Sequence, residues 1–250
     1  MIKMKSLIAI GSFVLLSAFC AFQEGWVVSS ITEVDTAHKN SETFYTGKKS
    51  YSIDITYSSF KGHEAVAPYE TMQGYYRYDN GRSHSQMQGV HIIVNGNYKM
   101  ILDTVHKTMI VTDPPSKLSA ELMQINYENS KQYITSCKKS PGELITAFKM
   151  EFSEQVAYSA YSLSFAKDGQ LKDITVFYRK EYPSDSKAPN SPKLKPKLKI
   201  SYGPVVEKIM FNPAKEFELT KYFTELKGTL KATSAYSTYQ VIDSRSSRKR

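Results

Sequence analysis

Cysteine is nearly absent from this 250-residue chain, which contains only Cys20 and Cys137. Small exported domains that depend on disulfides carry an even set of several cysteines. Because Cys20 lies in a segment that we expect to be removed, no internal disulfide framework is predicted. The fold must therefore be stabilised by burial of apolar side chains, and we expect Cys137 to be a partly buried thiol.

Long hydrophobic runs are absent beyond residue 22, so no transmembrane span is expected in the mature chain. The single long apolar run, residues 7–19, is too short for a permanent span. Two lysines precede it and small residues end it, which is the layout of a secretory signal peptide. We predict a signal peptide over residues 1–20 and an exported protein, located in the periplasm or at the cell surface.

Cys20 allows a second interpretation of this N-terminal segment. A bacterial lipoprotein signal ends in a cysteine that is acylated and then anchors the protein to a membrane. Such a signal has a small residue directly before the cysteine, whereas this chain has Phe19. We therefore expect cleavage after Cys20, and acylation at Cys20 is the alternative.

Motifs that carry catalytic or metal-binding chemistry are also absent. The sequence contains no nucleophile elbow, phosphate loop, dinucleotide fingerprint or zinc-type pairing of histidines and cysteines. His84 and His91 are separated by an odd number of residues, so on regular strands we expect them to face opposite sides of a sheet. The other histidines are scattered, at His38, His63 and His106. We predict no catalytic residue, no metal site, no cofactor and no enzymatic activity.

Acidic residues are fewer than basic ones, and the formal net charge is +9. Much of the excess lies in the last six residues, at Arg245, Arg248, Lys249 and Arg250. A second basic stretch, 187–199, alternates lysine with proline and leucine, which indicates an extended loop. Charge confined to a tail and a loop does not form a nucleic-acid surface, so we predict no nucleic-acid partner.

Aromatic residues and regular hydrophobic patterns are plentiful. Apolar residues spaced by three or four predict an amphipathic helix over 27–43, and strict alternation predicts a strand over 51–57. Short alternating segments follow over 69–112. Asn80-Gly81 and Asn95-Gly96 separate some of them, and such pairs favour tight hairpin turns. We therefore predict an antiparallel meander.

The second half of the chain repeats this pattern of a helix followed by strands. A helix is predicted from Ser116 to about residue 130, and a short helix is predicted over 217–226. Further strands are predicted at 147–152, 157–165, 171–182 and 196–202. We assign residues 21–228 to one domain and expect the polar, basic tail, 229–250, to be disordered.

Four segments carry a resemblance to a known family. They are residues 74–85, 94–103 and 163–174, in which strands of alternating pattern flank an Asn-Gly or Asp-Gly turn, and residues 107–111, a strand that ends in a short apolar run. Together with the order of helix, strand, meander, helix and second meander, they resemble the lipoprotein-carrier superfamily of bacterial envelope proteins, the LolA/LolB-like fold. The resemblance spans roughly residues 27–210.

The resemblance implies an α+β fold with a curved antiparallel half-barrel sheet, covered on its concave face by helices. Carriers of this kind bind acyl chains in the apolar space between sheet and helices. The candidate ligand-binding residues are Met72, Tyr76, Tyr78, Ile92, Met100 and Leu102. The alternative is that these residues simply form the core beneath the helices.

Two functions follow from this interpretation. In the first, the protein is a carrier that binds a lipid, a lipoprotein acyl chain or another apolar ligand. In the second, it is a non-enzymatic scaffold or assembly subunit of an envelope or secretion apparatus. The second function would use the C-terminal extension, where residues 236–241 could add a strand to the sheet edge of an envelope protein partner.

Overall fold

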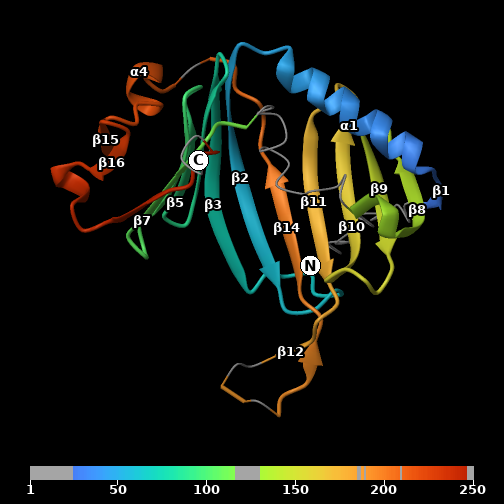
Figure 1. Ribbon diagram of the computed structural model, residues 1–250. Coiled ribbons are helices and arrows are strands. Elements are labelled where there is room, and N and C mark those ends of the chain that lie inside the picture. The colour runs from blue at the N-terminus through green and yellow to red at the C-terminus, as the bar shows by residue number, and fades with distance from the viewer. Residues whose placement is uncertain (1–24, 116–129, 185–186, 189, 209, 247–250) are drawn as a thin grey trace, which may run out of the picture.

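The computed structural model describes residues 25–115, 130–184, 187–188, 190–208 and 210–246 (Figure 1). Its helical elements are α1 (Ile31–Thr46), η1 (Lys131–Tyr133), α4 (Pro213–Glu216) and η2 (Ser234–Tyr236). The strands are β1 (Val27–Val28), β2 (Ser50–Phe60), β3 (Glu70–Asp79), β4 (Arg82–Met87), β5 (Val90–Val94), β6 (Lys99–Asp103), β7 (Thr108–Thr112), β8 (Ile134–Pro141), β9 (Ile145–Phe152), β10 (Tyr158–Ala166), β11 (Leu171–Tyr178), β12 (Tyr182–Pro183), β13 (Lys193–Leu194), β14 (Lys197–Tyr202), β15 (Phe223–Leu226), β16 (Thr229–Ala232) and β17 (Gln240–Asp243).

A single large sheet dominates this described part of the chain. Its thirteen strands follow the order β1-β8-β9-β10-β11-β14-β2-β3-β4-β5-β6-β7-β17, and it curves strongly (Figure 1). Neighbouring strands are antiparallel except for β17, which pairs with β7 in parallel. The predicted antiparallel meander is therefore confirmed, and the two meanders meet where β14 pairs with β2.

Two tight turns have the positive φ angles that short hairpins require. Asn80 and Gly81 have φ angles of 46° and 83°, and Gln88 and Gly89 have φ angles of 45° and 79°. Two successive positive φ angles give the twist that a two-residue hairpin requires, and glycine adopts them without steric cost. These turns set the register of β3, β4 and β5.

Helix α1 starts later than the periodicity predicts, because Ser30 caps it. The Ser30 hydroxyl accepts a hydrogen bond from the Glu33 backbone N–H, and the Glu33 side chain accepts one from the Ser30 N–H. This capping box satisfies backbone groups that would otherwise lack partners. Residues 27–28, which we expected to be helical, instead form β1 at the edge of the sheet.

The register divides the sheet into two faces. Tyr76 is paired with Ile53, and both belong to the apolar cluster that also contains Val34 and Tyr45 of α1. We call this side the α1 face. Paired residues point to the same side of a sheet and successive residues alternate, so Arg77 and its partner His84 lie on the opposite face.

A second apolar cluster occupies the opposite face of β5, β6 and β7. It joins strand residues such as Met100 and Val111 to Leu219, Tyr222 and Leu230 from the C-terminal part of the chain. Residues from 219 to 241 of the C-terminal segment, 213–246, thus add apolar cover to a face that α1 does not reach (Figure 1).

The C-terminal segment corrects two predictions. Residues 217–226, which we expected to be helical, follow the short α4 and end in β15. Residues 229–246, which we expected to be disordered, contain β16, η2 and β17. The physical reason is burial: Leu230 is 8% exposed and Arg245 is 7% exposed, so the segment has both apolar and polar anchors.

Two further predictions concern the surroundings of the sheet. The helix predicted from Ser116 lies largely outside the described residues, which stop at 115 and resume at 130. The extended loop predicted over 187–199 instead contains β13 and the start of β14, and β13 pairs with β12 in a small ladder that projects beyond one end of the sheet (Figure 1). Among the described residues, no helix is long and apolar enough to cross a membrane.

Candidate functional site

A groove lies between α1 and the sheet, with a volume of about 710 Å³. Its helix side is formed by residues that include Thr36, Ala37, Asn40 and Phe44. Its sheet side includes Phe148 of β9 and Phe165 of β10, whose rings meet edge to face with centroids 6.2 Å apart. The volume falls within the range of roughly 300–1,000 Å³ that is usual for small-molecule sites.

Different side chains of α1 face the core and the groove. Val34 and Tyr45 are almost completely buried in the sheet side of the helix, at 0% and 3% exposure. Ala37 and Phe44 pack at the margin of the same cluster and also line the groove. One helix therefore supplies both a fixed core contact and an accessible apolar wall, because its side chains radiate at about 100° per residue.

One end of the groove carries a fixed ion pair. Glu33 at the start of α1 accepts hydrogen bonds from Lys139 of β8 and, at 2.5 Å, from the Ser29 hydroxyl. The Lys139 and Ser29 hydrogen bonds lower the pKa of Glu33 to about 2. Glu33 is therefore ionised at any physiological pH, and it holds the first turn of α1 against the edge of the sheet.

Gly169 brings the other end of the groove close to α1. It lines the groove in the turn between β10 and β11 and has a φ of +93°, which favours glycine. A Cβ atom there would lie 2.9 Å from the Asn40 carbonyl oxygen. The neighbouring Lys167 and Asp168 add one charge of each sign to the lining.

The candidate residues predicted from the sequence do not all lie together. Met72, Tyr76, Tyr78 and Ile92 share the α1 face, because the register links Tyr76 to Ser85 and Ser85 to Ile92. None of these residues lines the groove described above.

Met100 and Leu102 correct the prediction, because they lie on the opposite face. Met100 pairs with Ile93, the residue after Ile92, so its side chain points away from the α1 face. Both side chains are buried, at 0% and 2% exposure, under the C-terminal segment. They are core residues and do not contribute to a ligand surface on the α1 face.

A polar cluster on the opposite face was not predicted. The Nδ1 atom of His84 lies 2.6 Å from Glu216 Oε1, and Arg77 Nη1 lies 2.7 Å from the same oxygen. The Nε2 atom of His84 lies 3.0 Å from His91 Nδ1. We call His84, His91, Glu216 and Arg77 the histidine cluster.

The prediction that His84 and His91 face opposite sides is wrong. They belong to different strands of one hairpin, in which Gln86 pairs with His91 and His84 pairs with Ile93. Across a two-residue turn, residues separated by an odd number lie on the same face. The sequence contains this signal, in the Gln88-Gly89 turn, but it is visible only once the turn has been located.

The proton positions in the histidine cluster follow from its partners. A carboxylate can only accept, so His84 donates through Nδ1–H to Glu216, which leaves His84 Nε2 as the acceptor for His91 Nδ1–H. Burial is the main cause that lowers the pKa of His84, to about 4, and burial also lowers the pKa of His91. Within the described ranges, no group of three or more histidine, cysteine, aspartate or glutamate side chains, this cluster included, is arranged so that it could hold a metal ion.

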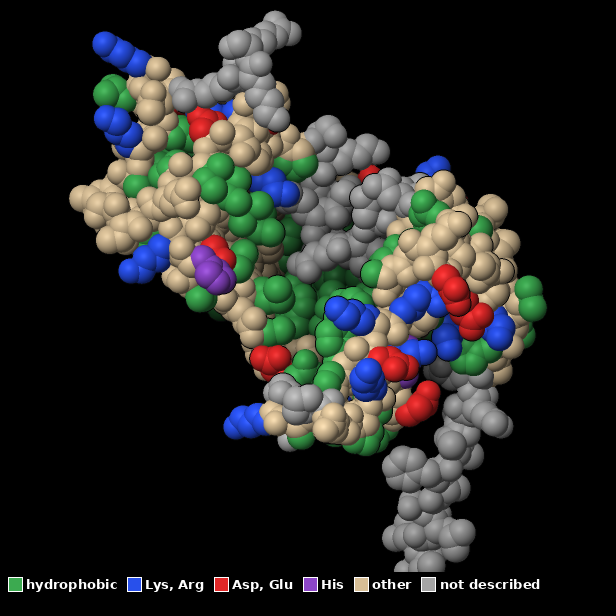
Figure 2. All heavy atoms as spheres, turned by 60° about the horizontal axis from the view of Figure 1, so that its bottom comes forward, with side chains coloured by type: hydrophobic (Ala, Val, Ile, Leu, Met, Phe, Trp, Pro, Cys, Tyr) green, Lys and Arg blue, Asp and Glu red, His purple; other side chains and the backbone are tan. Residues whose placement is uncertain are grey.

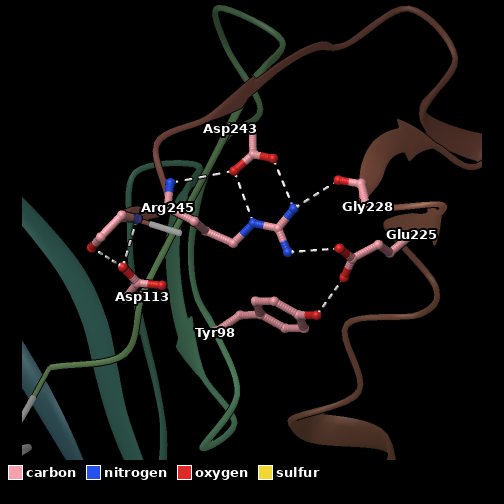
Figure 3. A network of polar contacts seen from close by, with 7 residues as sticks. Tyr98, Asp113, Glu225, Gly228, Asp243 and Arg245 are labelled. Carbon is pink, nitrogen blue, oxygen red and sulfur yellow. Dashed lines mark hydrogen bonds and ion pairs between the residues drawn. The ribbon is translucent and has the colours of Figure 1, made fainter. Parts of the chain in front are cut away.

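A second polar network fixes the end of the chain (Figure 3). The Arg245 guanidinium donates to Asp243, to Glu225 at 2.9 Å and to the Gly228 carbonyl at 3.2 Å. Tyr98, in the turn before β6, donates to Glu225 at 2.6 Å. This network ties β17 and the β15–β16 hairpin to the sheet.

No protein-family model and no curated protein matches this sequence. Solved structures are similar, among them a LolA superfamily protein from Nitrosomonas europaea, with a TM-score of 0.33 and 9% identity over 74% of this chain and 96% of that chain. The lipoprotein LppX from Mycobacterium tuberculosis has a TM-score of 0.39 and 10% identity, over 73% of this chain and 100% of its own. LprF from Mycobacterium bovis has a TM-score of 0.32 and 9% identity, over 75% of this chain and 99% of its own.

Proposed function

We propose that this protein is an exported, non-enzymatic carrier that binds the acyl chain of a lipid or lipoprotein in the groove beside α1. In this proposal the curved sheet acts as a half-barrel, and α1 covers part of its concave face. The observation that carries the proposal is the groove of about 710 Å³ with phenylalanine rings on both walls.

The lining suits a hydrocarbon chain better than a polar metabolite. The partly exposed Phe44 and the edges of the nearly buried Phe148 and Phe165 line the groove, and burial of each CH₂ group contributes roughly 0.8 kcal/mol. The acidic and basic side chains of the lining balance in number, with Glu33 and Asp168 against Lys139 and Lys167. The groove therefore provides no net charge that would select a multiply charged ligand.

Two further apolar residues of the α1 face lie outside the groove, on β3. Met72 and Tyr78 pack against the cluster under α1 but retain partial exposure. Figure 2 shows hydrophobic side chains on the floor of a hollow between two rims of the molecule.

Two tryptophan substitutions in α1 test the proposal directly. Asn40 lines the groove, whereas Thr46 is an exposed residue of the same helix that does not. We expect Asn40→Trp to weaken binding of the fluorescent fatty acid cis-parinaric acid at least tenfold, and Thr46→Trp to leave it unchanged. Equal affinity in both variants, or no saturable binding by the native protein, would contradict the carrier function.

Native mass spectrometry of protein purified from an envelope fraction supplies an independent test. A co-purified acyl species supports the carrier. A clean mass in stoichiometric complex with another protein would instead support the scaffold function, in which the groove has no ligand.

A further inference from the structure

Two loops meet at the end of the sheet from which β12 and β13 project. The first loop, residues 61–69, connects β2 to β3, and the second contains the β12–β13 ladder between β11 and β14. Lys61 Nζ donates to the Ser184 carbonyl at 2.7 Å, and Lys197 Nζ donates to the His63 carbonyl at 2.6 Å. These bonds join the two loops into one surface, which we call the basic tip. It comprises Lys61, Val66, Tyr69, Lys180, Tyr182, Lys193, Leu194 and Lys195.

Large apolar side chains of the basic tip are exposed to solvent. Val66 is 97% exposed, Tyr69 57%, Tyr182 49% and Leu194 37%. Their exposure is confined to loops and a two-residue ladder, so none of them contributes to the sheet core. Apolar side chains gathered on one projection indicate an interaction surface.

The same surface is rich in lysine. The two loops, 61–69 and 179–196, together contain six basic and three acidic residues. Among the lysines of the tip, Lys195 faces Glu181 at 4.0 Å, with both side chains about half exposed, so this pair neutralises little of the charge. The tip therefore presents a net positive field around its exposed apolar residues.

The lysines and tyrosines are arranged as amphipathic pairs. Lys61 Nζ lies 5.8 Å from the centre of the Tyr69 ring, and Lys180 Nζ lies 5.2 Å from that of Tyr182. Tyrosine rings favour the level of lipid headgroups, and lysine stems lie along apolar surface while the ammonium group reaches water or phosphate. Exposed valine and leucine would enter the layer just beneath.

We propose that the basic tip docks on the surface of an anionic lipid bilayer. A lipid surface accounts for both properties at once, because anionic headgroups attract the lysines and the acyl boundary accepts Val66 and Leu194. A nucleic acid would use the charge but would leave these two aliphatic side chains in water. The inference goes beyond ligand binding in the groove and does not depend on it.

Vesicle co-sedimentation of the mature chain tests this inference without any ligand in the groove. The probes are vesicles of phosphatidylcholine alone and of phosphatidylcholine mixed with phosphatidylglycerol. We expect the protein to sediment with the mixed vesicles, to bind neutral vesicles at least tenfold more weakly, and to be released by high salt. Equal binding to both vesicle types, or no binding to either, would overturn the inference.

Two sets of variants locate the surface. The triple variant Lys180→Glu, Lys193→Glu and Lys195→Glu should reduce binding to the mixed vesicles at least tenfold. The matched variant Lys39→Glu, Lys49→Glu and Lys231→Glu changes three exposed lysines elsewhere by the same charge and should retain most of the binding. Equal losses in both would show that net charge alone drives binding, which contradicts a defined tip.

Val66→Ser tests the apolar part of the surface, because it changes no charge and Val66 makes no core contact. We expect it to weaken vesicle binding several-fold and to leave the unfolding temperature unchanged. Unaltered vesicle binding, or stronger binding of native protein to duplex DNA than to the mixed vesicles, would also overturn the inference. Affinity for cis-parinaric acid should be the same in all these variants, so a failed carrier function would be recognised separately.

Discussion

His84 Nδ1 and Glu216 Oε1 lie 2.6 Å apart and join strand β4 to a helix that follows 132 residues later in the chain. Arg77 binds the same carboxylate, so one acidic side chain of α4 is held by two basic side chains of the sheet. This contact fixes the start of the C-terminal segment, and the Arg245 network fixes its end. The two networks suggest how stability depends on pH and on single side chains.

Acidification should destabilise the protein through His84. Burial lowers the pKa of His84 to about 4 from 6.5, so the folded state binds this proton less well than the unfolded state. The contribution of neutral His84 to the free energy of unfolding is fully present above pH 6.5. It is lost progressively as the pH falls from 6.5 towards 4. By linkage, we expect the free energy of unfolding to drop by about 2 kcal/mol between pH 7 and pH 5.

Urea denaturation at these two pH values measures this loss. His84→Asn should reduce the difference between them, whereas His106→Asn, a change at an exposed histidine in the β6–β7 turn, should leave it unchanged. If the unfolding free energy of both variants still drops between pH 7 and pH 5 by the same amount as in the native protein, the pH dependence arises from other groups.

Removal of the Glu216 carboxylate should loosen the C-terminal segment before the rest of the sheet. Glu216→Ala leaves Arg77 and His84 without their acceptor, which costs about 1–3 kcal/mol. Hydrogen exchange followed by mass spectrometry should show faster exchange in residues 213–246 than in β2 and β3. Glu218→Ala, at an exposed position two residues away, is the control. Uniformly faster exchange over the whole chain would contradict a local role.

Local patterns in the sequence were sufficient to predict most strands of both meanders. Asn80-Gly81 and the alternation of 51–57 act over a few residues, so neighbouring strands could be paired without knowledge of the rest of the fold. The pairing of β17 with β7 is different. It joins Gln240 to Thr108, far apart in the sequence, and no turn signal connects them.

The faces of the candidate site residues depend on how neighbouring strands are paired, and the pattern within one strand does not contain this register. Ile92 and Met100 were assigned to one face, but Met100 pairs with Ile93 across the β5–β6 hairpin. A shift of one residue in register moves a side chain to the other face of a sheet. The groove was missed for a related reason, because α1 crosses Phe148 and Phe165, which are distant from it in the sequence.

Loss of the Arg245 guanidinium should release β17 from the sheet. Arg245 is 7% exposed and its side chain binds Asp243 and Glu225. Arg245→Leu removes the shared partner of these two carboxylates, which are themselves partly exposed, so we expect a loss of about 1–3 kcal/mol. Limited proteolysis should then cleave within residues 229–246 at protease concentrations that leave the native protein intact. Lys231→Leu, at an exposed position on β16, should not change the cleavage pattern.

Truncation of Met100 should separate stability from ligand binding. Met100 is 0% exposed and packs under the C-terminal segment, so Met100→Ala leaves a cavity and costs about 2–5 kcal/mol in unfolding free energy. Because Met100 lies on the face opposite the groove, we expect the affinity for cis-parinaric acid to stay within a factor of two at a temperature where the variant is folded. Phe148→Leu, a smaller change in the groove wall, should lower that affinity more while costing less stability. If Met100→Ala instead weakens binding more than Phe148→Leu does, the ligand occupies the opposite face of the sheet.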